Sequence, residues 1–219
     1  MYANLKPSES LQRRVFLTVS LAAILLSGCR KAPRLAALQP GQTVLAFGDS
    51  VTFGIGAAVG EDWPGLLAQK TGWNIVNAGV SGDTAQNGKN RIAALLDLHR
   101  PALVIIEIGG NDFLRRRPSK TVKEDIRHVI QAVHRTGARA ALVSVPELSV
   151  LGVVAGRPSD SPIYEELSNE ELLPLIPGVF SQILARPELC ADRIHPNAQG
   201  YQVMATGIHA RLREVGLAT

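Results

Sequence analysis

The sequence predicts a single α/β domain in which helices cover both faces of a parallel sheet. Short apolar runs that end in glycine alternate with longer segments of helical periodicity, and no internal repeat is present. The run 103–108 is almost wholly apolar, as expected of a parallel strand buried on both faces. A chain of 219 residues with 46% hydrophobic content can bury one core of this kind.

The expected strands and helices follow one another in order along residues 43–219. The glycine-bounded run from Val44 towards Ser50 is expected to be the first strand, at the centre of the sheet. Four more strands are expected at 74–78, 103–108, 139–145 and 172–176, and Pro174 favours an edge position for the last. Helices are expected from Asp62 to about Lys70, from Asp83 or Thr84 to before Pro101, over 119–136, and from Asn197 to about Val215.

Two details of this assignment depend on weaker patterns. Ile92, Leu95, Leu96 and Leu98 are expected to form the apolar stripe of the second long helix. The segments 51–56 and 146–165 show neither strand alternation nor a helical stripe, and both are expected to be loops.

Residues 1–28 are expected to be an export signal outside the fold. Arg13 and Arg14 precede an apolar run, 15–26, that is too short to span a bilayer comfortably. The run ends in Leu-Ser-Gly-Cys29, which resembles a bacterial lipobox, and this implies that Cys29 is lipidated and begins the mature protein. A plain signal peptide or an N-terminal anchor helix is the alternative. Residues 29–42, with two prolines, are then a tether.

The expected location is therefore the cell envelope, with the protein anchored to a membrane by lipid on Cys29. Arg30 is not the aspartate that retains such proteins at the inner membrane. This favours the outer membrane or its periplasmic face in a host that has two membranes. The sequence has two cysteines, so lipid on Cys29 would leave Cys190 as a single thiol. Cys190 lies five residues from His195, but a small, buried hydrophobic role is the simpler interpretation.

Chemistry-bearing residues follow the ends of the expected strands, where open α/β sheets bind their ligands. Ser50 follows the first strand, and a serine hydroxyl needs a base before it can act as a nucleophile. Asp192 and His195, three residues apart before the last helix, can supply an acid and a base. Donors for an oxyanion can come from the backbone of Gly82 and the side-chain amide of Asn111.

These residues resemble the four sequence blocks of SGNH hydrolases, the GDSL esterase/lipase superfamily. The matching strings are Gly48-Asp49-Ser50, Gly82, Gly109-Gly110-Asn111-Asp112 and Asp192-Arg193-Ile194-His195. The strings 77–84 and 107–112 are similar to the bacterial thioesterase/arylesterase/lysophospholipase subgroup. The resemblance implies a flavodoxin-like three-layer α/β/α domain over 43–219 with a five-stranded parallel sheet.

The resemblance also implies the chemistry. Ser50 would be the nucleophile, His195 the general base and then acid, and Asp192 the group that orients the imidazole. The oxyanion hole would combine the Ser50 and Gly82 backbone N–H groups with the Asn111 side chain. The substrate would be a small acyl ester or thioester, or a lysophospholipid-like molecule. Asp49 and Asp112 are expected to hold loops through backbone hydrogen bonds rather than to transfer protons.

Several alternatives stay open at this point. Asn111 and Asp112 could simply form a turn. Arg115–Arg117 could be solvated surface or could attract anionic head groups. Residues 147–164 could line an acyl groove, act as a lid, or pack without touching substrate. At the level of function, the alternatives are an O-acetyl esterase of envelope polysaccharide and a non-catalytic lipid-binding lipoprotein.

No cofactor or metal is expected, because no His/Cys/Asp cluster has ligand spacing. The formal net charge of +4 falls to +2 when residues 1–28 are set aside, which is too weak to indicate nucleic-acid binding. No feature points to an obligate protein partner.

Overall fold

A five-stranded parallel sheet forms the centre of the structure, a computed structural model that describes residues 36–147 and 158–219. The strand order is β2-β1-β3-β4-β5, and each neighbouring pair is parallel. The strands are β1 (Thr43–Gly48), β2 (Asn74–Gly79), β3 (Leu103–Glu107), β4 (Arg139–Val143) and β5 (Leu175–Ile176). The five predicted strands and the edge position of β5 are confirmed. The prediction that β1 is the central strand is wrong, because β3 occupies the middle and β1 lies between β2 and β3.

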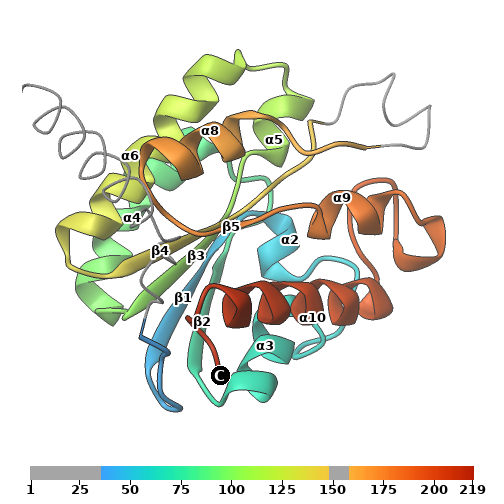
Figure 1. Ribbon diagram of the computed structural model, residues 1–219. Coiled ribbons are helices and arrows are strands. Elements are labelled where there is room, and N and C mark those ends of the chain that lie inside the picture. The colour runs from blue at the N-terminus through green and yellow to red at the C-terminus, as the bar shows by residue number, and fades with distance from the viewer. Residues whose placement is uncertain (1–35, 148–157) are drawn as a thin grey trace, which may run out of the picture. The chain divides into compact units, whose positions relative to one another are not determined.

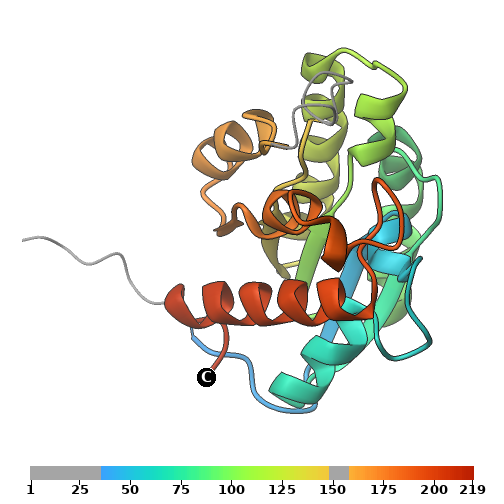
Figure 2. The ribbon, with the colours of Figure 1, turned by 90° about the vertical axis from the view of Figure 1, so that its right-hand side faces the viewer.

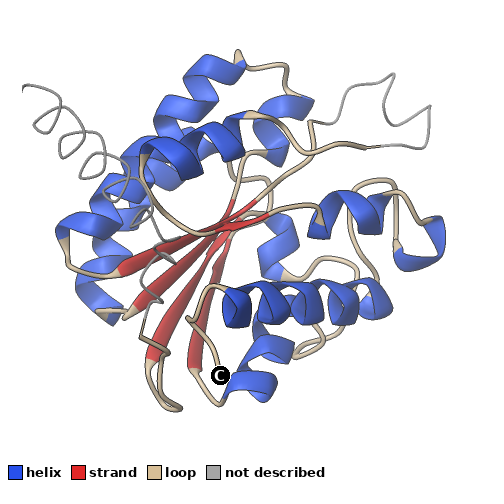
Figure 3. Cartoon of the chain, in the orientation of Figure 1, coloured by secondary structure: helices blue, strands red, loops and turns tan. Residues whose placement is uncertain are grey.

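Helices cover both faces of this sheet and give three layers (Figures 1 and 3). On one face α4 (Ala85–His99) packs against α6 (Ser119–Arg135), and α8 (Ile163–Glu170) packs against α6. On the other face α3 (Trp63–Thr71) packs against α10 (Ala198–Glu214). The α/β/α architecture predicted from the sequence is therefore confirmed.

The short helices were not predicted. They are α2 (Ser50–Phe53), α5 (Gly110–Leu114), α9 (Val179–Leu184) and the 3₁₀ turn η1 (Pro187–Leu189). Loops were predicted at 51–56 and 146–165. This is wrong for residues 51–53, which belong to α2, and for residues 163–165, which begin α8. One or two turns are too short to establish a hydrophobic period, so sequence periodicity could not reveal these helices. In Figure 2, α9 lies above α10.

Helix boundaries follow the predicted capping residues. Asp62 accepts a hydrogen bond from the Gly65 amide (2.9 Å), and Asn197 accepts one from the Gly200 amide (2.9 Å). Of the two candidates before α4, Thr84 is the N-cap. The predicted apolar stripe of α4 holds at the buried Ile92 and Leu96. It is wrong at Leu98, which is 73% exposed because a position two residues beyond Leu96 faces the opposite side of a helix.

The register of the sheet brings three strand ends to one level. Gly48 at the end of β1 is aligned with Gly79 of β2 and with Glu107 of β3. A Cβ on Gly48 would lie 2.1 Å from the Thr52 hydroxyl oxygen, and one on Gly79 would lie 2.1 Å from the Phe53 nitrogen. Only glycine therefore allows α2 to turn back so closely over the strand ends. The loops after β1, β2 and β3 consequently leave the sheet side by side.

The expected signal, Cys29 and most of the loop 147–164 lie outside the described residues. The last part of the expected tether, from residue 36, is described and packs on the domain. The Leu38 side chain is buried, and its amide donates to the Leu217 carbonyl (2.9 Å). The domain boundary at residue 43 stays a prediction. Among residues 36–147 and 158–219, none of the helices combines the length and the apolar character needed to cross a bilayer.

Candidate active site

Ser50 is the first residue of α2, directly beyond the end of β1. Asp49 caps this helix, since its Oδ1 accepts from the Val51 amide (3.0 Å). Helix α2 ends after a single turn at Gly54, whose φ of 103° is in the left-handed region. This tight strand-turn-helix fixes the Ser50 hydroxyl at the carboxyl edge of the sheet, where the side chain is nearly buried.

Asp192 and His195 lie on one short loop before α10. The loop is closed at its base by pairing between Cys190 and Pro196, and the Ala191 amide donates to the His195 carbonyl (2.9 Å). Asp192 Oδ1 accepts from the backbone amides of Ile194 and His195, both at 2.8 Å. The three-residue spacing between acid and base is therefore a turn that the aspartate stabilises itself.

The structure joins these residues into one hydrogen-bonded chain. His195 Nδ1 lies 2.7 Å from Asp192 Oδ2, and His195 Nε2 lies 2.9 Å from Ser50 Oγ. In the tautomer whose Nδ1–H donates a hydrogen bond to the Asp192 carboxylate, Nε2 is free of a proton and accepts a hydrogen bond from the Ser50 hydroxyl. Burial raises the pKa of Asp192, but the hydrogen bonds from His195 and Ile194 outweigh it and leave this pKa below its usual value. Asp192 thus remains an anion beside the imidazole.

Asn111 and Gly82 lie on the two neighbouring loops. Asn111, on α5, donates from Nδ2 to the Asp83 carbonyl (2.9 Å) and makes a longer contact with Asp49 Oδ2 (3.4 Å). Gly82 has a φ of 79°, and its carbonyl accepts from Arg115 (3.1 Å). The loops after β2 and β3 are thus bonded to each other beside Ser50.

Ser50, Asn111 and His195 line one depression. Gly82 is not among its lining residues within the described chain. The lining is completed by Asp49, Val51, Gly110, Leu114, Phe180 and Ile194. The apolar lining by Leu114, Phe180 and Ile194 was not predicted, because these residues come from three separate segments and no local pattern connects them.

Arg91 on α4 is a further residue whose role was not predicted. Its guanidinium donates to the Gly48 carbonyl (2.9 Å), the Ala78 carbonyl (2.9 Å) and Asp83 Oδ2 (2.7 Å). It also lies 4.2 Å over the centre of the buried Phe47 ring. One side chain therefore ties together the ends of β1 and β2 and the loop that carries Gly82. A helical arginine has no sequence feature that reveals this role.

Asp49 and Glu107 are buried carboxyl groups beside the site. Burial is the main reason that the pKa of Asp49 rises to about 7; the Asp83 and Asp112 carboxylates raise it further, and the Val51 amide and His195 oppose the rise. Burial, and then the proximity of Asp49, also raise the pKa of Glu107 well above its usual value. Glu107 Oε2 accepts from the Thr52 hydroxyl (2.7 Å).

The expected loop-holding roles of Asp49 and Asp112 are confirmed. Asp49 caps α2, and Asp112 accepts from the Ala85 amide (2.8 Å) at the start of α4. Asp112 also pairs with Arg117, which bonds Asp125 as well (2.9 Å). Arg117 is thus engaged in internal ion pairs. The hypothesis that Arg115–Arg117 attract anionic head groups stays a prediction.

Two other expectations concern Cys190 and metal binding. The Cys190 thiol is partly buried and lies 3.5 Å from the Ile183 carbonyl, and burial raises its pKa. A raised pKa disfavours a reactive thiolate, which supports the structural interpretation of Cys190. Within the described ranges, no three His, Cys, Asp or Glu side chains are grouped so that they could hold a metal ion.

The three-layer parallel fold and the hydrogen-bonded Ser50, His195 and Asp192 define the class of protein as a serine hydrolase. The sequence signature of the GDSL-like Lipase/Acylhydrolase family matches residues 46–203, and the chain belongs to this family. The predicted membership of the GDSL superfamily is confirmed, and the protein is a hydrolase of ester bonds.

The chain is also similar to individual proteins whose names are those of esterases and thioesterases. The Escherichia coli (strain K12) thioesterase 1/protease 1/lysophospholipase L1 is 33% identical, over 78% of this chain and 83% of the relative. A Vibrio mimicus arylesterase is 31% identical, over 75% of this chain and 84% of the relative. The crystal structure of TesA superposes with a TM-score of 0.70 and 27% identity, over 80% of this chain and 99% of that one.

The raised pKa of Asp49 predicts a pH-dependent stability. Its pKa is about 7 in the folded protein and about 4 in an unfolded chain, so folding favours the protonated form. The contribution of Asp49 to the free energy of unfolding is therefore fully present below pH 4 and is lost as the pH rises through 7. The Asp49→Asn variant cannot ionise at this position and so does not lose this contribution. Between pH 4 and 8, the free energy of unfolding of the variant should therefore rise relative to that of the wild type, by an amount on the order of a few kcal/mol. Urea unfolding of both proteins across this range measures the difference, and parallel pH profiles would contradict it.

Proposed function

We propose that this protein hydrolyses acyl esters and thioesters with Ser50 as nucleophile, His195 as base and acid, and Asp192 as the orienting acid. The observation that carries the proposal is the continuous hydrogen-bonded chain from Asp192 through His195 to Ser50. Each link is 2.9 Å or shorter, which is within the range required for proton transfer.

The first step is attack of Ser50 Oγ on the acyl carbonyl while its proton passes to His195 Nε2. The imidazolium that forms is stabilised by the Asp192 carboxylate. Collapse of the tetrahedral intermediate breaks the ester or thioester bond, and His195 gives its proton to the leaving alcohol or thiol. Water, deprotonated by His195, then attacks the acyl-enzyme and releases the carboxylic acid and free Ser50.

The oxyanion of each intermediate is assigned to the Ser50 and Gly82 backbone N–H groups and the Asn111 side chain. The Ser50 N–H stands at the first position of α2, where helical N–H groups have no partner in the helix. The Asn111 amide uses one hydrogen to bond the Asp83 carbonyl, which sets its orientation. Its other hydrogen makes only the long contact with Asp49, so it is available to a developing oxyanion.

The acyl group is assigned to the side of the depression lined by Leu114, Phe180 and Ile194. These side chains lie beside Ser50 and His195 and offer apolar surface next to the reacting carbonyl. The printed names of the relatives, a thioesterase and lysophospholipase and an arylesterase, favour acyl esters with an apolar part. The polysaccharide O-acetyl esterase alternative has no comparable support.

Replacing Ser50 is the direct test of the nucleophile. Ser50→Ala should abolish hydrolysis of p-nitrophenyl butyrate by the form that begins after Cys29, and it should prevent labelling by a fluorophosphonate. Unchanged circular dichroism would show that the fold is intact. Near-wild-type turnover in this variant would refute the assignment.

Acyl-chain preference tests the apolar lining. Leu114 is 45% exposed, so Leu114→Ala should leave stability almost unchanged. It should lower kcat/KM for a p-nitrophenyl octanoate several-fold, because apolar contact with the chain is lost, and should leave the acetate unaffected. Leu172→Ala is the matched control, since Leu172 is 90% exposed and does not line the depression. A wild-type enzyme that accepts only the acetate would instead support the O-acetyl esterase.

The cell-envelope location is proposed from the sequence alone, through lipid on Cys29. In a host that processes lipoproteins, Cys29→Ala should lose incorporation of labelled palmitate and move from the membrane to the soluble fraction. Cys190→Ala, which removes the other cysteine of the chain, should keep both properties. Palmitate label that persists in Cys29→Ala would rule out this anchor.

A further inference from the structure

Tyr164 is a buried aromatic residue that the catalytic chain does not use. It lies on α8, a helix that sequence periodicity did not reveal, and it is fully shielded from solvent. Its hydroxyl donates to the carbonyl of Ile108 (2.8 Å), the residue that follows β3. Burial keeps the pKa of this hydroxyl well above its usual value, so it retains the proton that it donates.

The Ile108 carbonyl lies at the entrance to the loop that carries Asn111. Next to it, Gly109 has a φ of 129°, and a Cβ there would lie 2.4 Å from the Tyr164 hydroxyl. The hydroxyl therefore fills the space above this glycine. No side chain caps the N-terminus of α5. The hydrogen bond from Tyr164 to the Ile108 carbonyl therefore restrains the backbone directly before this helix.

The ring of Tyr164 reaches the other side of the same segment. Phe113, two residues beyond Asn111, meets it edge to face, with centroids 6.5 Å apart and planes at 76°. One side chain thus touches the chain both before and after Asn111. Such a two-point contact restricts the position of α5 and the direction of the Asn111 amide.

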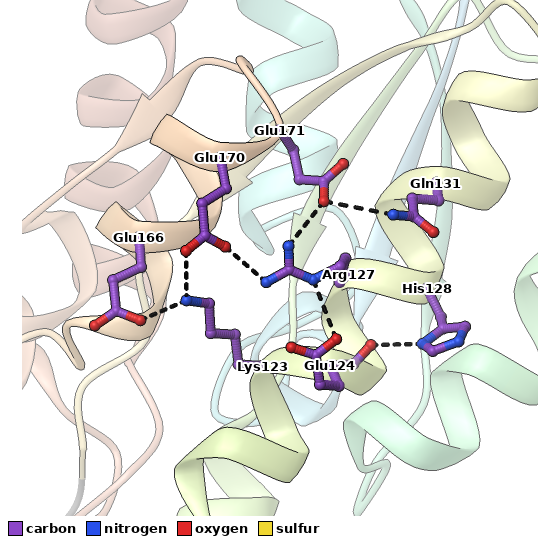
Figure 4. Close-up of polar contacts among 8 residues, drawn as sticks. All are labelled: Lys123, Glu124, Arg127, His128, Gln131, Glu166, Glu170 and Glu171. Atoms are coloured by element: carbon purple, nitrogen blue, oxygen red, sulfur yellow. Dashed lines mark hydrogen bonds and ion pairs between the residues drawn. The ribbon is translucent and has the colours of Figure 1, made fainter.

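Helix α8 is itself fixed to α6 by a network of charges (Figure 4). Lys123 pairs with Glu166 (2.6 Å) and Glu170 (2.9 Å). Arg127 pairs with Glu170 (2.6 Å) and Glu171 (3.0 Å). Lys123 and Arg127 are partly buried and Glu166 and Glu170 are about half exposed, but the pairs share partners, so the network restrains α8 more than isolated surface pairs would. Tyr164 is therefore presented from a fixed helix.

We propose that Tyr164 is a positioning residue for ester hydrolysis, which acts through the Ile108–Phe113 segment to hold the Asn111 amide where the oxyanion forms. Because a displacement of less than 1 Å weakens an oxyanion hydrogen bond, the contact influences the rate rather than substrate binding. The inference rests on the proposed role of Asn111.

A double-mutant cycle with Tyr164→Phe and Asn111→Ala tests this inference. Tyr164→Phe removes the hydroxyl and keeps the ring, and it should lower kcat roughly five- to tenfold with little change in KM. Asn111→Ala should lower kcat by roughly 10²–10³. In the Asn111→Ala background, Tyr164→Phe should have almost no further effect on kcat, because the group through which it acts is absent.

A matched control separates positioning from stability. The Ser168 hydroxyl, also on α8, donates to the Leu173 carbonyl (2.7 Å), away from the Asn111 segment. Ser168→Ala should lower the midpoint of urea unfolding but leave kcat unchanged. If Tyr164→Phe does not fold, Phe113→Leu removes the contact on the other side of Asn111 and should show the same dependence on Asn111.

The outcomes are distinguishable. Wild-type kcat in Tyr164→Phe, or an equal loss in the wild-type and Asn111→Ala backgrounds, would overturn the inference about Tyr164 while the role of Asn111 stands. Wild-type kcat in Asn111→Ala would overturn the oxyanion assignment and, with it, this inference. Neither result bears on Ser50, whose own substitution tests the nucleophile.

Discussion

The close approach of three parallel strand ends is the constraint on which the active site depends. Gly48 and Gly79 allow α2 to fold back over the sheet at distances that any Cβ would prevent. Because the register aligns them with Glu107, the loops after β1, β2 and β3 begin at the same height. Ser50 and the two loops that carry Gly82 and Asn111 are thereby brought together by backbone geometry, before any side chain contributes.

A cluster of acidic side chains accompanies this convergence. Within the described residues, Asp83 and Asp112 are paired with arginines, whereas the raised pKa values of Asp49 and Glu107 reflect burial without such a partner. Asp49 also lies close enough to His195 for their charges to interact. The helix-capping acid thus has an electrostatic as well as a structural effect.

Much of the fold could be predicted because strands buried on both faces and capped amphipathic helices leave strong local patterns. The order of the motifs likewise indicated Ser50, Asn111 and His195, which the structure brings to one depression. The contributions of Arg91 and Tyr164 could not be predicted. Each side chain donates hydrogen bonds to backbone carbonyls that are distant in the sequence. Such bonds depend on strand register and on where the helices pack, and no local sequence pattern reveals either.

The turn that carries Asp192 and His195 has a consequence for how activity is lost. Its internal hydrogen bonds make acid and base a self-contained unit, while the side chain of Asp192 remains 53% exposed. Local opening of such a loop requires far less free energy than disruption of the sheet. We therefore expect heat to separate His195 from Ser50 while the core is still intact, and we expect this loss of activity to reverse on cooling. The highest temperature at which the protein acts should then lie where this one loop opens, below the temperature at which the domain melts.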